Sequence, residues 1–282
     1  NKIKIASFFD AVRDIHSQLP TSYIRATIRP NVWTIISREF ESLSHIRQYL
    51  LDLNWTSVDL EQVLYWRIRG YIQRKGLWGR MSSMLRGSEE NKRRTVISLV
   101  FQDPMKWGEG SKAPSHVIST LSKQRPRWAI ELSKASSLAA MHNSHKKIIL
   151  DDIMSLLDLF GKNRIHDIIA EFKSQCPQIE DLIVMFRQSS EEFDTEQLLS
   201  FIGKKIYKLT NLLITGAIGQ PTERDVASFL FDIGFIAGKK YQDGGYEHFA
   251  FADRPFFFKS LTTEEDDLWW EIHPCYRQAL EI

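Results

Sequence analysis

The sequence predicts a mainly α-helical fold with an α/β remnant at its N-terminal end and a winged-helix domain at its C-terminal end. Three observations lead to this fold class. Residues 1–74 alternate helical and strand-like patterns, residues 115–186 have helical periodicity throughout, and the residues from 194 onward place helices before a strand hairpin.

Composition places the chain among ordinary globular proteins. Its 37 Lys and Arg against 35 Asp and Glu give a formal net charge of +2, which predicts no general affinity for polyanions. The two cysteines, Cys176 and Cys275, lie far apart and lack metal-ligand spacing, so we expect free thiols and a cytoplasmic protein. The apolar runs are far shorter than the roughly 20 residues of a membrane helix, and we expect no membrane span.

Residues 1–74 have the pattern of an α/β unit with a parallel sheet. Apolar residues recur at helical spacing as far as Ile15, and the β-branched, aromatic segment 22–29 that follows predicts a buried strand. A helix over 32–43, a strand over 48–54 and a helix from Thr56 to about Arg74 follow. Two strands are too few for a stable sheet, so we expect more of it on chain preceding Asn1.

The segment from 76 to 114 is rich in glycine and contains one strand-like stretch, residues 96–101. Between Arg67 and Arg94 there are nine Lys or Arg, against Glu89 and Glu90. Such a stretch predicts either a nucleic-acid contact or a solvated face with a flexible loop. The residues expected to contact nucleic acid are Arg74, Lys75, Arg80, Arg86, Lys92, Arg93 and Arg94.

Helical patterns continue over residues 116–122, 126–141, 150–160, 164–173 and 179–186. Capping signals at Asp194 and Thr222 then begin two further helices. The segments 234–241 and 247–252 flank a Gly-rich turn and predict a hairpin, and a strand over 268–272 and a helix from Pro274 end the chain. Helices followed by a hairpin wing favour a winged-helix domain.

Common catalytic motifs are absent or incomplete. The segment from Gly234 to Lys240 is not a phosphate-binding loop, because three residues instead of four separate its glycines and Lys240 replaces the required hydroxyl. His142 and His145 lack a third metal ligand nearby. The acidic run 264–267 is more typical of a solvated loop than of a magnesium site.

Two arginine sites are candidates for binding phosphate. Arg29 ends the predicted strand 22–29, and ligands bind beyond the carboxyl ends of strands in open α/β sheets. Arg125 and Arg127 open a helix whose N-terminus, together with the guanidinium groups, suits an anion. Surface or capping charges are the alternative interpretation of each.

The order of these segments resembles the second half of bacterial P-loop ATPases of the STAND and AAA+ superfamily, of the defence-associated type with a C-terminal winged helix. The matching segments are 24–33, 51–56, 64–68, 125–127, 233–236 and 272–274. The resemblance implies that residues 1–54 end the ATPase core, 55–160 form a helical lid with a basic loop, and 161–282 form a helical linker and the winged helix.

The resemblance also implies roles for the arginines. Arg29 would be the sensor 1 residue, and Arg125 or Arg127 the sensor-2-like lid arginine that contacts the ATP phosphates. Walker A and Walker B are absent, and the family would place both before residue 1, so we expect no hydrolysis by this chain alone. ATP and Mg²⁺ would be bound by the intact protein.

The expected partners are the Walker A/B half of the same protein and either further copies in a homo-oligomer or an effector protein, with a role in antiviral defence. The alternative function is a non-enzymatic winged-helix module that binds DNA or a protein partner.

Overall fold

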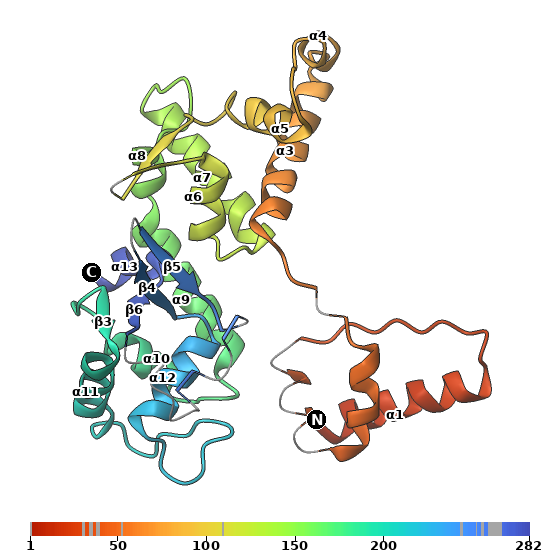
Figure 1. Cartoon of the computed structure of the whole chain (residues 1–282), viewed down its shortest axis with the longest axis vertical. Coiled ribbons are helices and arrows are strands. Elements are labelled where there is room, and N and C mark those ends of the chain that lie inside the picture. The colour runs from red at the N-terminus through yellow and green to blue at the C-terminus, as the bar shows by residue number, and fades with distance from the viewer. Residues whose placement is uncertain are drawn as a thin grey trace. The chain divides into compact units, whose positions relative to one another are not determined.

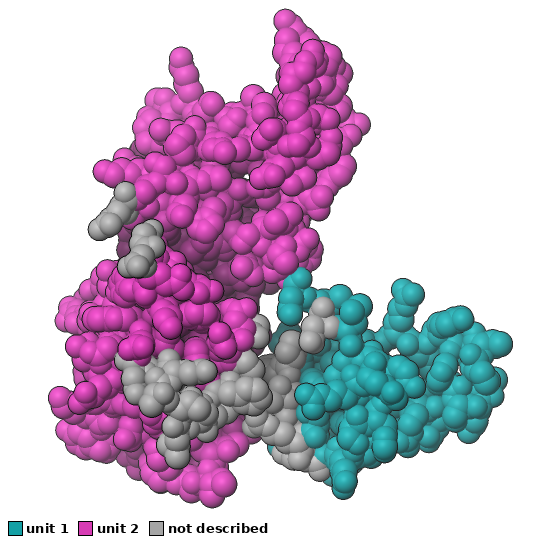
Figure 2. Space-filling model, in the orientation of Figure 1, with its two compact units in different colours: residues 1–54 teal, residues 55–282 magenta. Residues whose placement is uncertain are grey.

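The computed structural model describes residues 2–29, 32–33, 36–37, 40–51, 53–108, 110–242, 245–251, 253–254, 257–258 and 267–282. It divides into two compact units, 1–54 and 55–282 (Figure 2). The described residues are mainly helical, with a two-stranded and a four-stranded antiparallel sheet. The predicted mainly α fold is therefore confirmed.

The first unit contains helix α1 (Lys2–Gln18) and the 3-10 helix η1 (Glu41–Tyr49) (Figure 1). Its small core joins Ala6 and Phe9 of α1 to Ile36 and Leu43. The ring of Phe9 also meets Trp33 edge-on, at 5.8 Å between centroids. The helix predicted from the apolar spacing of the first residues is confirmed.

The two strands predicted in this unit are wrong. Residues 22–29 have no regular secondary structure and pair with no described strand, and the side chain of Tyr23 is 91% exposed. His45 to Tyr49 belong to η1, and the described residues from Leu50 to Asn54 have no strand partner either. A β-branched pattern makes a buried strand only where a neighbouring strand covers its backbone, and the described part of this unit has none.

The second unit begins with α3 (Ser57–Arg74), α4 (Trp78–Ser82) and α5 (Glu89–Ile97). The predicted cap at Thr56 is confirmed, because Thr56 and Asp59 form a reciprocal capping box. The strand predicted at 96–101 is wrong. Val96 and Ile97 are buried as the last turn of α5, and only Phe101 makes a β-bridge, to Ile148.

A short hairpin of β1 (Met105–Trp107) and β2 (Gly110–Lys112) follows, with too few residues for a sequence pattern to detect. The next helices are α6 (Pro114–Leu121), α7 (Pro126–His142), α8 (Leu150–Met154), α9 (Leu157–Phe172) and α10 (Ile179–Val184). The predicted break near residue 161 is wrong, because α9 is continuous. The expected lid boundary at 160 therefore falls inside a helix.

The C-terminal part contains β3 (Glu192–Asp194), α11 (Thr195–Ile206), α12 (Glu223–Asp232), β4 (Ile236–Gln242), β5 (Gly245–Phe249), β6 (Trp269–Ile272), α13 (Pro274–Arg277) and η3 (Gln278–Leu280). The antiparallel sheet has the order β3-β6-β4-β5. The predicted caps at Asp194 and Thr222, the hairpin and the last strand are confirmed, whereas β3 was missed.

The core of this unit joins the sheet to the helices. Trp270 on β6 is fully buried against Phe231 of α12, and its indole Nε1 donates a hydrogen bond to Thr195 Oγ1 at 2.9 Å. A buried indole needs such a partner, so this bond fixes the first turn of α11 to the sheet. No helix among the described residues is long and apolar enough to cross a membrane.

Two glycines should respond in opposite ways to alanine. A Cβ on Gly161 of α9 would lie 2.6 Å from the Cys275 carbonyl oxygen and 2.9 Å from Ala279 Cβ. Gly161→Ala should therefore lower the free energy of unfolding by about 1–3 kcal/mol. Gly203 of α11 has nothing within 4 Å, so Gly203→Ala should raise it by about 0.5–1 kcal/mol. Urea unfolding followed by circular dichroism measures both, and shifts of the same sign would contradict the packing.

Candidate functional site

Three segments that lie far apart in the sequence meet in the second unit. The turn between α6 and α7 carries Lys123 and Arg125, and it packs against residues 233–236 after α12 and residues 272–276 after β6. His273 N donates a hydrogen bond to the Phe235 carbonyl at 3.0 Å, which joins the last two segments. We call Lys123, Gly234, His273, Cys275 and Tyr276 the Lys123 junction.

Lys123 caps the last turn of α12 from another part of the chain. Its Nζ donates hydrogen bonds to the carbonyl oxygens of Ile233, at 3.1 Å, and Gly234, at 2.7 Å, and lies 3.2 Å from the Tyr276 hydroxyl. Ile233 is the C-cap of α12, where unpaired carbonyls carry partial negative charge. The ammonium group therefore satisfies both hydrogen bonding and charge at this helix end.

Gly234 is needed for this contact. Its φ of +65° lies in the left-handed region, and a Cβ there would lie 2.8 Å from Lys123 Nζ. No sequence motif pointed to Lys123, because a lone lysine between two helices has no distinctive spacing. The sequence motifs that include Gly234 indicate neither its left-handed backbone nor its contact with Lys123.

The burial of Cys275 and His273 disfavours a Cys–His catalytic pair. Burial raises the pKa of Cys275 to about 12, and burial, with the positive charge of Lys123, holds the pKa of His273 well below its usual range. His273 Nδ1 lies 3.1 Å from Cys275 Sγ, but both groups are neutral near pH 7. A nucleophilic thiolate needs the opposite shift. His273 instead caps α13 by accepting a hydrogen bond from Cys275 N.

The two arginines that open α7 have different surroundings. Arg125 Nη1 pairs with Glu171 at 3.0 Å, and its guanidinium lies 4.5 Å from the centroid of the Trp128 ring, which also contacts Arg164. The side chain of Arg127 is exposed and makes no hydrogen bond or ion pair with the described residues. No side chain caps α7, so Arg127 lies beside first-turn N–H groups that can donate hydrogen bonds to an anion.

Arg29 is exposed and belongs to the first unit, at the end of the irregular segment 22–29, and its carbonyl accepts a hydrogen bond from Trp33 N at 3.0 Å. It therefore does not end a sheet strand, and the strand-end geometry behind its predicted phosphate role is absent from the described residues.

The basic stretch divides into paired and unpaired residues. Lys92 pairs with Glu89 at 2.7 Å, Arg93 with Glu61 at 3.0 Å, and Arg94 makes two bonds to Asp103 at 2.6 and 2.9 Å. Arg86 donates to the Ser83 carbonyl. The side chains that are exposed and make no hydrogen bond or ion pair with described residues are Arg67, Arg74, Lys75 and Arg80.

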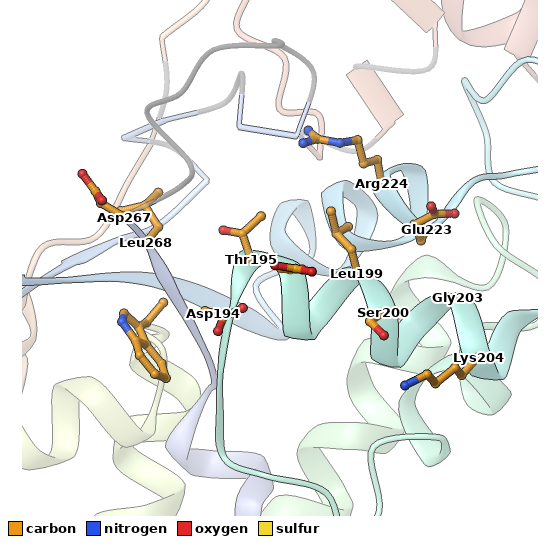
Figure 3. Close-up of a pocket in the computed structure, with 12 residues that line it drawn as sticks. Asp194, Thr195, Leu199, Ser200, Gly203, Lys204, Glu223, Arg224, Asp267 and Leu268 are labelled. Atoms are coloured by element: carbon orange, nitrogen blue, oxygen red, sulfur yellow. The ribbon is translucent and has the colours of Figure 1, made fainter.

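A groove of about 940 Å³ runs along α11, the first turn of α12 and the start of β6 (Figure 3). Its lining is mixed in charge, with acidic Asp194, Glu196, Glu223 and Asp267 and basic Lys204 and Arg224. Within the described ranges, no three or more His, Cys, Asp or Glu side chains gather as metal ligands would. A polypeptide with both charges fits this lining better than a phosphate does.

Comparisons with known proteins found no likeness. No family model matches the chain, and neither the curated proteins nor the solved structures contain a significant match to it.

Stability should rise with pH because of Lys123. Burial lowers its pKa from 10.5 to about 8, so between these values the unfolded chain holds a proton that the folded protein has released. From pH 7.5 to 10, the free energy of unfolding should increase by up to about 3 kcal/mol relative to Lys123→Met. Urea unfolding of both proteins at each pH measures this. A difference in free energy of unfolding between the two proteins that does not change with pH would contradict it.

Proposed function

We propose that this chain is the sensor, lid and winged-helix part of an ATP-dependent molecular switch. One observation carries the proposal. Lys123, which holds the last turn of α12, lies two residues before Arg125 and four before Arg127. A phosphate bound at the start of α7 would therefore act on the turn that holds α12. A nucleotide switch needs such a link between the residue that contacts the nucleotide and the domain that responds.

The order of elements supports a winged-helix assignment for residues 179–272. The helices and strands follow the order α10-β3-α11-α12-β4 along the chain. In the sheet, β6 lies between β3 and β4 and pairs with both. In this assignment β5 is an added strand on the outer edge, and the segment from β4 to β6 is the wing.

A protein partner suits this domain better than DNA. Exposed positions of α12 carry the acidic residues Glu223 and Asp232, which would repel a phosphate backbone. Lys239, beside the wing, is buried, pairs with Glu192, and lies over the rings of Tyr241 and Tyr246. The mixed-charge groove between α11 and α12 would then hold an effector segment or part of a second copy.

ATP would be bound mainly by chain that precedes Asn1, because the 282 residues contain neither Walker motif. In this proposal Arg127 meets the phosphates through an exposed guanidinium and the open N-terminus of α7, whereas Arg125 positions that turn through Glu171 and Trp128. Arg29 would sense the γ-phosphate. The ligands for Mg²⁺ would come from the Walker half.

Arginine variants of the intact protein test this function. Arg127→Ala and Arg29→Ala should each lower ATP turnover roughly 10- to 100-fold, because each removes a charged hydrogen bond to phosphate. Neither exposed side chain supports the fold, so circular dichroism and thermal midpoints should not change. Phosphate release at saturating ATP is the measurement.

Arg125→Ala is the matched control, because it should lower the thermal midpoint by removing the Glu171 pair and the Trp128 contact. Unchanged turnover in both Arg127→Ala and Arg29→Ala would reject the sensor roles. A gene with no phosphate-binding loop upstream of Asn1 would reject the ATPase as a whole.

A binding module without nucleotide chemistry is the second candidate. The groove along α11 favours it, since the groove has a mixed-charge lining and lies far in sequence from both phosphate-site candidates. Effector binding that persists without ATP, in a protein that does not hydrolyse it, would support this candidate.

A further inference from the structure

We propose that α3 and α4 carry a binding surface for single-stranded nucleic acid. The surface, here called the basic ridge, consists of Arg67, Tyr71, Arg74, Lys75 and Arg80, with Trp66 beside it. It is separate from the phosphate site at α7 and from the groove along α11, and it does not depend on ATP binding. Figure 1 shows α4 directly beyond the C-terminal end of α3.

The charge of this region is entirely positive over a long stretch. Residues 62–88 contain no Asp or Glu, and their basic residues are Arg67, Arg69, Arg74, Lys75, Arg80 and Arg86. The flanking acids do not neutralise the ridge, because Glu61 pairs with Arg93 and Glu89 pairs with Lys92. A net charge near zero for the whole chain therefore conceals a local polyanion site.

The structure selects the residues that are available to a ligand. Arg86, Lys92, Arg93 and Arg94 bind carbonyl or carboxylate oxygens of the chain itself, so they are poor phosphate contacts. The four basic residues of the ridge are exposed and make no hydrogen bond or ion pair with described side chains. Binding to these four would break no internal contact of that kind.

Helical spacing places the ridge on one face of α3. Arg67, Tyr71 and Arg74 recur at positions i, i+4 and i+7, and therefore line about 10 Å of the helix. Lys75 is four residues after Tyr71, and its Nζ lies 5.7 Å from the centre of the Tyr71 ring. Positive groups thus flank an aromatic face, which is the arrangement that holds a base between phosphate contacts.

The exposed aromatic rings favour a single strand over a duplex. Tyr71 is 57% and Trp66 55% exposed, so each ring keeps an accessible area although Lys75 lies over Tyr71. The Arg69 guanidinium lies 4.6 Å from the Trp66 ring and 4.7 Å from the Trp78 ring, so it holds both indoles in place. Unpaired bases can stack on such fixed rings, whereas the bases of a duplex cannot.

The first test measures binding of the whole chain to fluorescein-labelled dT20 by fluorescence anisotropy at 25–200 mM salt. Four phosphate contacts predict a slope of about −2.8 for log K against log salt. Arg67→Ala/Arg74→Ala should make the slope less steep by about 1.4 and weaken binding about tenfold at low salt. The control variant Lys173→Ala/Lys208→Ala also loses two positive charges, from exposed positions outside the basic ridge, and should bind dT20 like the original protein.

The second test separates stacking from charge. Tyr71→Leu keeps an apolar side chain but removes the aromatic face, and it should weaken dT20 binding roughly 5- to 150-fold, whereas Tyr71→Phe should bind like the original protein. Circular dichroism confirms that the variants fold. Equal or tighter binding of a 20-base-pair duplex, no binding of dT20 at 25 mM salt, or a Tyr71→Leu variant that binds normally would each overturn the proposal.

An anionic membrane is the alternative ligand for the basic ridge, and anionic vesicles test it. The ridge borders an apolar groove of about 640 Å³ lined by Leu64, Ile72 and Met81, which an acyl chain would also suit. Displacement of bound dT20 by phosphatidylserine vesicles at equal accessible charge would overturn the assignment to nucleic acid. Retention of dT20 under these conditions supports it.

Discussion

The contact between Lys123 and the end of α12 is the constraint that relates the parts of the second unit. It joins the turn between α6 and α7 to the segment between α12 and β4 across more than a hundred residues of chain. The contact requires a left-handed backbone at Lys123, a glycine at 234 and a tyrosine hydroxyl at 276. Removing any one of these would leave buried polar groups without partners, which is costly in an apolar core.

A second buried network holds the sheet. Burial raises the pKa of Glu271, but its hydrogen bond to His248 and the charges of Arg277 and Lys239 outweigh burial and lower it overall. Burial likewise lowers the pKa of Lys239, yet the bonds to Glu192 and Tyr241 raise it to about 12. These side chains come from all four strands and from α13, so the network links the sheet to the last helix.

Arginines close in sequence can have unrelated roles. Arg125 is used by the fold, since Glu171 and Trp128 occupy its guanidinium, whereas Arg127 remains available to a ligand. The same division runs through the basic stretch, where carboxylates pair with the arginines of α5 but leave Arg67, Arg74 and Arg80 exposed. Counting charged residues in the sequence finds such a basic region. Only the folded positions of the acidic side chains decide which basic side chains remain available to a ligand.

The sequence by itself determined the features that depend on near neighbours. Capping boxes at Thr56, Asp194 and Thr222 and the hairpin after residue 236 were predictable, because each involves residues only a few positions apart. The strand predicted at 22–29 failed because a strand depends on a partner that local pattern does not supply. The Lys123 junction and the pairing of Arg125 were decided by tertiary structure alone, since both join residues that only the folded chain brings within hydrogen-bond distance.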